Sequence, residues 1–87
     1  MERADKRIED LRLAAYYDAY GAMLTPKQSE VFNLYYNEDL SLGEIAALSR
    51  TSRQAIADTL ARARRRLLAL ESGLGLVTAK VGEADGI

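Results

Sequence analysis

The chemistry of this sequence is concentrated in its arginines. Residues 50–66 contain six of them against one acidic residue, whereas the whole chain has a formal net charge of −1. Guanidinium groups can contact nucleic-acid phosphates or an acidic protein surface without reading sequence. They can also form a solvated helix face near the negative end of the helix dipole. Both interpretations stay open for Arg62, Arg64, Arg65 and Arg66.

The chain contains no histidine and no cysteine. Their absence excludes disulfides, thiol nucleophiles, imidazole acid–base chemistry and ordinary zinc sites. The acidic residues are scattered rather than clustered, and there is no glycine-rich phosphate loop. Ser41 and Ser52 have no base near them in sequence and are better explained as helix caps. We therefore expect a protein that is not an enzyme and holds no cofactor or metal.

A long helix must position most of the arginines. Ser52 is a typical N-cap, and apolar residues recur behind it at helical spacing. We expect this helix over residues 53–71, ended by Gly73 in a left-handed conformation. Arg62, Arg65 and Arg66 share one of its sides. The predicted buried line consists of Ile56, Leu60, Ala63, Leu67 and Leu70.

The segment before this helix has the pattern of a helix-turn-helix unit. Ser41 and Glu44 form a capping box, and the small side chain of Ala46 suits a close helix crossing. A short turn over residues 49–51 then leads to Ser52. An ordinary pair of antiparallel helices is the alternative. The predicted inner face of the first helix of the unit consists of Leu42, Ile45, Ala46 and Leu48.

Two further helices complete an all-α fold, a small helical bundle. Thr25, Pro26 and Gln28 form a helix start, and this helix extends to Tyr36. The first helix, residues 5–23, carries two apolar stripes, which is more than a single surface helix needs. It is either a central core helix or one that also meets a partner subunit, and we expect a homodimer. The stripes are Ile8, Leu11, Ala15, Ala19 and Ala22, and Leu13, Tyr16, Tyr17, Tyr20 and Leu24.

The 87 residues provide for one domain. We expect it over residues 1–77, followed by a flexible tail over residues 78–87. The sequence lacks a signal-peptide apolar segment and any apolar run of about 20 residues, so we expect a cytoplasmic protein without membrane insertion. Its tyrosines are more typical of core or dimer packing than of stacking on RNA bases. They are Tyr16, Tyr17, Tyr20, Tyr35 and Tyr36.

The start of the long helix offers few groups that could read bases. Arg53 suits guanine and Gln54 suits adenine, while Ala57 offers only a methyl contact. Asp58 could accept from cytosine, but an ion pair with Arg62 four residues later is favoured. The candidate residues for binding nucleic acid or a protein partner are Ser52, Arg53, Gln54, Ala57, Asp58, Arg62, Arg65 and Arg66.

Several strings in the sequence resemble the YlxM family of bacterial proteins, which is similar in its helix-turn-helix to region 4 of sigma factors. The resemblance implies a bacterial cytoplasmic protein encoded near the signal recognition particle GTPase, with a regulatory role in that targeting pathway. The strings are Leu24-Thr-Pro-Lys-Gln28, Leu34-Tyr-Tyr36, Glu38-Asp-Leu-Ser-Leu-Gly-Glu-Ile-Ala46, Ser52-Arg-Gln-Ala-Ile56 and Leu74-Gly-Leu76.

Two classes of function follow from these observations. The first is a regulator or adaptor that acts on the signal recognition particle GTPase or its RNA. The second is a DNA-binding transcriptional regulator, which should prefer its specific site about 10³-fold or more over other DNA. A purely structural dimeric module is a third alternative, and it would bind neither partner.

Overall fold

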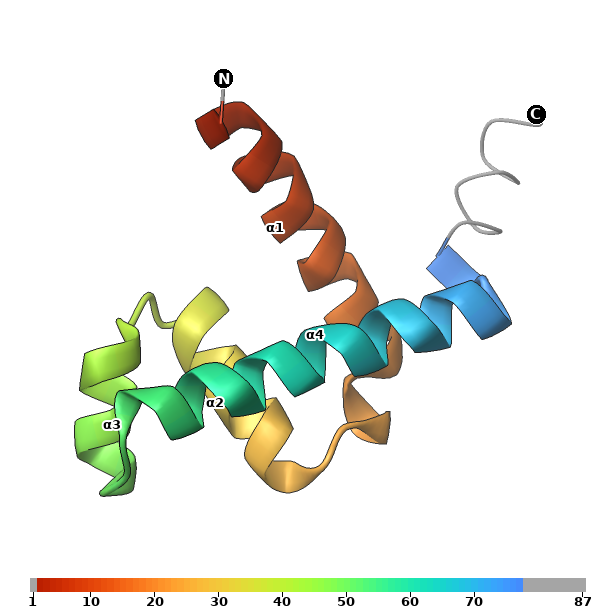
Figure 1. Ribbon diagram of the computed structural model, residues 1–87. Coiled ribbons are helices and arrows are strands. Elements are labelled where there is room, and N and C mark those ends of the chain that lie inside the picture. The colour runs from red at the N-terminus through yellow and green to blue at the C-terminus, as the bar shows by residue number, and fades with distance from the viewer. Residues whose placement is uncertain (1, 78–87) are drawn as a thin grey trace.

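Four α-helices and one short 3-10 helix make up the described part of the chain (Figure 1). The computed structural model describes the backbone of residues 2–77 and the side chains of residues 10–77. The all-α prediction is confirmed, and the predicted tail, residues 78–87, lies outside the described residues. In chain order the helices are α1 (Glu2–Tyr20), η1 (Gly21–Met23), α2 (Pro26–Tyr36), α3 (Leu42–Ser49) and α4 (Arg53–Leu74).

The predicted helix starts of α2, α3 and α4 are confirmed. The Thr25 hydroxyl accepts from the Gln28 backbone N–H at 3.1 Å, and the Gln28 side chain accepts from the Thr25 N–H at 3.2 Å. Ser41 and Glu44 form the same reciprocal pair, with distances of 3.1 and 2.8 Å. The Ser52 hydroxyl caps α4. These bonds satisfy N–H groups that a helix start leaves without partners, so short-range sequence signals define where three helices begin.

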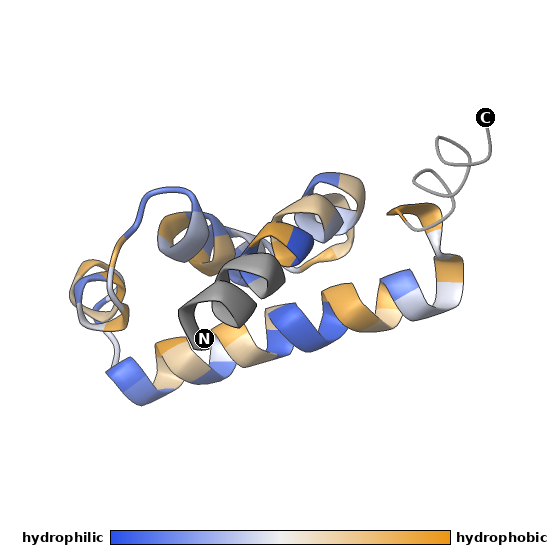
Figure 2. Ribbon diagram, turned by 90° about the horizontal axis from the view of Figure 1, so that it is seen from above, coloured by the Kyte–Doolittle hydropathy of each residue, from blue (hydrophilic) through white to orange (hydrophobic). Residues whose placement is uncertain are grey.

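The other helices pack against α4. Figure 2 shows α1, α2 and α3 on one side of α4, which leaves its opposite side open. Ile56, Leu60, Ala63 and Leu67 are buried on the inner side, as predicted, whereas Leu70 is only half-buried. The outward side therefore holds the polar part of the arginine-rich segment. The core is completed by Leu13, Tyr16, Tyr20, Leu24, Val31, Phe32, Ile45 and Ala46.

Only one of the two apolar stripes of the first helix belongs to the core. Tyr16 and Tyr20 of the second stripe are buried, whereas Leu11 of the first is 66% exposed. Ala19 and Ala22 of the first stripe are also exposed. The first helix thus gives its second stripe to the core, while the first stripe is mostly exposed in the described side chains, with Ala15 half-buried. The homodimer stays a prediction.

Leu48 does not belong to the inner face of α3, and this prediction is wrong. Its side chain is 68% exposed. In an eight-residue helix, Ile45 and Ala46 are buried against the core, and Leu48 lies about 60° round the helix from Ile45 and about 160° from Ala46. The apolar residue therefore falls beside the contact with the core rather than inside it.

The predicted end of α4 is also wrong. The helix continues past Gly73 to Leu74, and Gly75 is the residue in the left-handed conformation, with φ 62°. The Gly75 N–H donates to the Glu71 carbonyl at 2.7 Å. One further turn of α4 is favoured because the residues after Gly75 are bonded back to the core.

A buried hydrogen-bond network ties this end of α4 to α1. The Tyr20 hydroxyl donates to Glu71 Oε1 at 2.6 Å and accepts from the Leu76 N–H at 2.9 Å. Glu71 Oε1 also accepts from the Val77 N–H at 3.2 Å. Glu71 is only 8% exposed, so these bonds compensate for the burial of its polar group. We call these four residues the Tyr20–Glu71 network.

The turn of the helix-turn-helix unit depends on a left-handed residue that is not glycine. Arg50 has φ 54° and ψ 45°, and the Thr51 N–H donates to the Ala46 carbonyl at 3.0 Å. This bond pattern ends a helix sharply and redirects the chain, which is the role that glycine usually has. The turn therefore forms at residues 50–51, one residue later than predicted because Ser49 still belongs to α3, and it has a conformational cost at Arg50.

We expect the Arg50→Gly variant to be more stable by about 0.5–1 kcal/mol, because glycine adopts positive φ without a steric penalty. Chemical denaturation would measure this change. Thr51→Gly is the matched control, since Thr51 has no positive φ, and it should give no gain. A destabilised Arg50→Gly variant would contradict the proposed cost.

Candidate nucleic-acid interface

The first turn of α4 is accessible. Ser52, Arg53 and Gln54 are all exposed, although the Ser52 hydroxyl is already engaged as the cap. The Arg53 side chain passes over α3, where a Cβ on Gly43 would lie 3.8 Å from the Arg53 Cδ, an ordinary van der Waals distance. A small side chain at position 43 would therefore be compatible with the placement of this arginine. Ala57 is half-buried, so it offers less surface than the sequence suggested.

Asp58 and Arg62 form the predicted ion pair. Arg62 Nε lies 3.1 Å from Asp58 Oδ2, and both side chains are more than half exposed, at 64% and 52%. An exposed pair of this kind contributes about 0–1 kcal/mol. Arg62 can therefore leave Asp58 for a phosphate at small cost, while Asp58 places a negative charge beside any phosphate that approaches.

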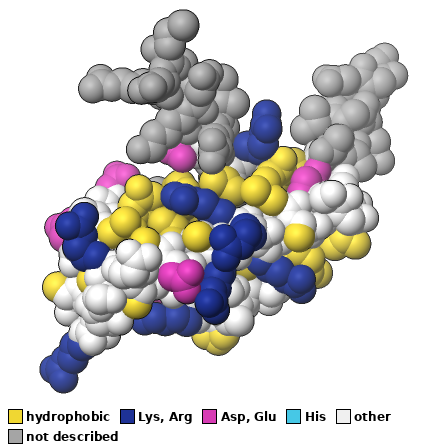
Figure 3. Space-filling view, in the orientation of Figure 1, with side chains coloured by type: hydrophobic (Ala, Val, Ile, Leu, Met, Phe, Trp, Pro, Cys, Tyr) yellow, Lys and Arg dark blue, Asp and Glu magenta, His cyan; other side chains and the backbone are white. Residues whose placement is uncertain are grey.

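Arg65 and Arg66 continue the exposed face of α4. Both are exposed, and neither forms an ion pair with a described residue. Figure 3 shows Lys and Arg side chains gathered over this side of the molecule with an acidic group among them. We call Gln54, Arg62, Arg65 and Arg66 the outer face of α4. It can contact phosphates, and it presents only one side chain suited to reading a base.

Arg64 has a different role from its neighbours. Its Nε donates to the Tyr36 hydroxyl at 2.8 Å, and its guanidinium lies over the Tyr36 ring, 5.7 Å from the ring centroid. Arg64 thus connects α4 to the end of α2. Sequence reasoning placed Arg64 in the basic run but did not find this partner, since the two residues are 28 positions apart.

Burial raises the pKa of Tyr36, and the hydrogen bond from Arg64 partly counteracts this effect. The hydroxyl is therefore protonated at neutral pH and can accept the Arg64 N–H without charge. The Tyr36 ring also packs on Phe32, with centroids 4.4 Å apart, and Phe32 stacks on Tyr17 at 4.7 Å. Core packing of the tyrosines is confirmed for Tyr16 and Tyr20, while Tyr17, Tyr35 and Tyr36 pack against the core and are partly buried.

The sequence profile of one protein family matches residues 6–85. Its description reads "Putative helix-turn-helix protein, YlxM / p13 like", and its designation is UPF0122. The chain belongs to this family. The match covers nearly the whole chain, and the YlxM resemblance is therefore confirmed. The UPF0122 description names a helix-turn-helix protein and no class of enzyme.

Individual relatives agree with the UPF0122 assignment. A UPF0122 protein of Thermoanaerobacter sp. (strain X514) is 52% identical over 67 residues, which are 77% of this chain and 57% of the relative. One from Clostridium botulinum (strain Alaska E43 / Type E3) is 48% identical over 71 residues, 80% of this chain and 65% of the relative. The chain thus spans between half and two thirds of the length of these curated relatives.

None of the helices that the structure describes is both long and apolar enough to cross a membrane.

Proposed function

We propose that the chain is a non-enzymatic cytoplasmic regulator that binds the RNA of the signal recognition particle through the outer face of α4. The observation that carries the proposal is the set of exposed arginines on a helix that the core holds in place. The link to the signal recognition particle pathway rests on the YlxM resemblance, and the exposed arginines support contact with phosphates.

Phosphate contact suits this face better than base reading. Arg62, Arg65 and Arg66 offer guanidinium groups along α4, and such contacts do not require a particular sequence. Asp58 lies among them and repels phosphate unless Arg62 neutralises it. RNA with a defined shape can be recognised by such backbone contacts, because its fold positions the phosphates.

A DNA-binding transcriptional regulator is the second candidate. The exposed Arg53 and Gln54 at the start of α4 favour it, since the first turns of a recognition helix meet base edges in the major groove. Two side chains give little discrimination between sequences, because one good bidentate contact contributes about 1–3 kcal/mol. The signal recognition particle GTPase is the protein partner that the resemblance offers as an alternative to its RNA.

We expect the Arg65→Ala/Arg66→Ala variant to bind the signal recognition particle RNA more weakly, with a salt slope reduced by about 1.5 because two phosphate contacts are lost. Fluorescence anisotropy with labelled RNA at several salt concentrations measures both quantities. The matched control is Arg12→Ala/Lys27→Ala, which removes the same charge from exposed positions on α1 and α2.

Three outcomes would reject this proposal. The control variant could lose as much affinity as the test variant, which would indicate a general charge effect. A single operator DNA could bind about 10³-fold more tightly than other DNA, which would establish the transcriptional regulator. The GTPase could bind the chain without its RNA, with Arg65 and Arg66 required, which would make the partner a protein.

A further inference from the structure

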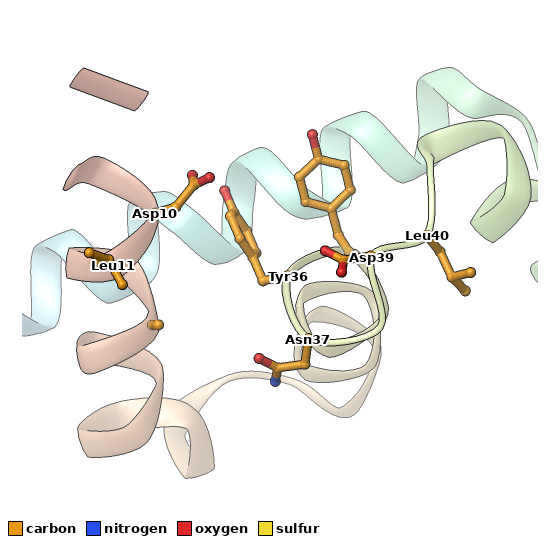
Figure 4. A pocket seen from close by; sticks show the side chains of 8 residues that line it. Asp10, Leu11, Tyr36, Asn37, Asp39 and Leu40 are labelled. Carbon is orange, nitrogen blue, oxygen red and sulfur yellow. The ribbon is translucent and has the colours of Figure 1, made fainter. Parts of the chain in front are cut away.

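A groove separates the middle of α1 from the end of α2, on a part of the molecule distinct from the outer face of α4. Its volume is about 490 Å³. Figure 4 shows Asp10 on α1 directed toward Tyr36 on α2, with Asn37 and Asp39 at the start of the connection to α3. The lining residues are Asp10, Leu11, Ala14, Tyr35, Tyr36, Asn37, Asp39 and Leu40.

The apolar part of the groove is accessible to a ligand. Leu11 is 66% exposed, and Tyr35, Tyr36 and Leu40 are partly buried residues at the edge of the core. The rings of Tyr35 and Tyr36 pack edge to face, with centroids 5.0 Å apart, and together they line one side of the groove. One or two side chains of the size of leucine or phenylalanine would bury apolar surface away from water here, which favours binding.

The described charged residues that line the groove are both acidic. Asp10 and Asp39 are the charged residues among the described lining of the groove, and neither forms an ion pair within the part of the chain that the structure describes. Arg64 is not a lining residue, and its guanidinium, which keeps its positive charge, is held at the Tyr36 hydroxyl by a hydrogen bond. Two carboxylates beside an apolar wall attract cations and repel phosphates, so RNA is not the ligand of this surface.

We propose that this groove binds a cationic, apolar segment of a partner protein. Leucine-like side chains of the segment enter beside Leu11 and Tyr36, and lysine or arginine side chains pair with Asp10 and Asp39. This surface goes beyond the proposed function, because its charge is opposite to that of the outer face of α4. The chain then has one surface for a polyanion and another for a basic protein segment.

The test uses the full chain and a labelled synthetic peptide of twelve residues, an amphipathic helix of leucine and lysine. We expect saturable binding in fluorescence anisotropy and amide shifts in NMR spectra at Ala14, Tyr36 and Leu40. Replacing the leucines of the peptide by serine should abolish binding. The Asp10→Asn/Asp39→Asn variant should lose about five- to tenfold in affinity, the effect of two partly exposed ion pairs.

The variants are chosen to keep the fold. Asparagine tolerates the left-handed conformation of Asp39, which has φ 58°. Asp18→Asn/Glu30→Gln is the matched control, since it removes two exposed acidic charges outside the groove. Equal losses in both variants would overturn the proposal, as would peptide-induced shifts confined to α4. Sedimentation that gives a dimer, with the groove amides protected in it, would also overturn it, because a second copy would then fill the groove.

Discussion

We expect the Tyr20→Phe variant to melt about 5 °C or more below the unchanged protein, because this hydroxyl links α1 to the end of α4 in the Tyr20–Glu71 network. The variant leaves the buried Glu71 carboxylate and the partly buried Leu76 N–H with one hydrogen-bond partner fewer. A carboxylate is costly to leave with fewer partners. Thermal unfolding followed by circular dichroism measures the change.

The matched control for this variant is Tyr16→Phe. Tyr16 is buried on the same helix, but its hydroxyl has no hydrogen bond to a described residue, so the control should melt almost unchanged. In Tyr20→Phe, amide exchange at Leu76 and Val77 should also become faster, since both N–H groups belong to the network. Equal melting temperatures for the two variants would show that the hydroxyl does not hold the end of α4.

The pH dependence of stability provides a second readout for Tyr20→Phe. Burial, with the hydrogen bond to Glu71, raises the pKa of Tyr20 above its ordinary value of 10. Above pH 10 the unfolded chain therefore loses this proton before the folded chain does, and the free energy of unfolding falls as the pH rises. The fall should be shallower in Tyr20→Phe, and an unchanged slope would contradict the raised pKa.

The second large effect concerns Ala46, the small residue where α3 crosses the core. It is 5% exposed, and its carbonyl accepts from the Thr51 N–H in the turn. We expect Ala46→Leu to lower the free energy of unfolding by about 1–3 kcal/mol, because three extra carbons must push α3 away from the core. Denaturant titration gives the value directly.

Ala47→Leu is the matched control for this prediction. Ala47 is the next residue of the same helix, is exposed and receives the same substitution. Its effect should stay within about 0.5 kcal/mol, as is usual for surface sites. If both variants were equally stable, Ala46 would not mark a close crossing, and the alternative of an ordinary helix pair would gain support.

Sequence predicted the parts of the fold that depend on neighbouring residues. The capping boxes at Thr25 and Ser41 and the ion pair of Asp58 with Arg62 involve residues three or four positions apart, so their partners are visible in the sequence. The end of α4 could not be found this way. Gly73 and Gly75 are both plausible stops, and the choice between them is linked to Tyr20, which lies more than 50 residues earlier.

The same limit applies to the candidate binding surfaces. The exposure of Arg62, Arg65 and Arg66 was predictable, since they share the side of α4 opposite its apolar line. The groove was not, because Asp10 and Asp39 belong to different elements and only the packing of α1 beside α2 brings them to one place. Arg64 and Arg65 are adjacent in sequence but differ in their surroundings. Arg64 is hydrogen-bonded to Tyr36, whereas Arg65 faces solvent.

The packing of α4 bears on the heat capacity change that accompanies binding. Along this helix, core residues such as Ile56 and Leu67 alternate with the arginines of the outer face, so the arginine backbone is fixed before any partner arrives. Association then needs no folding of the helix and covers mainly charged surface. Calorimetry of RNA binding should accordingly give a small change in heat capacity, in contrast to segments that fold on their target.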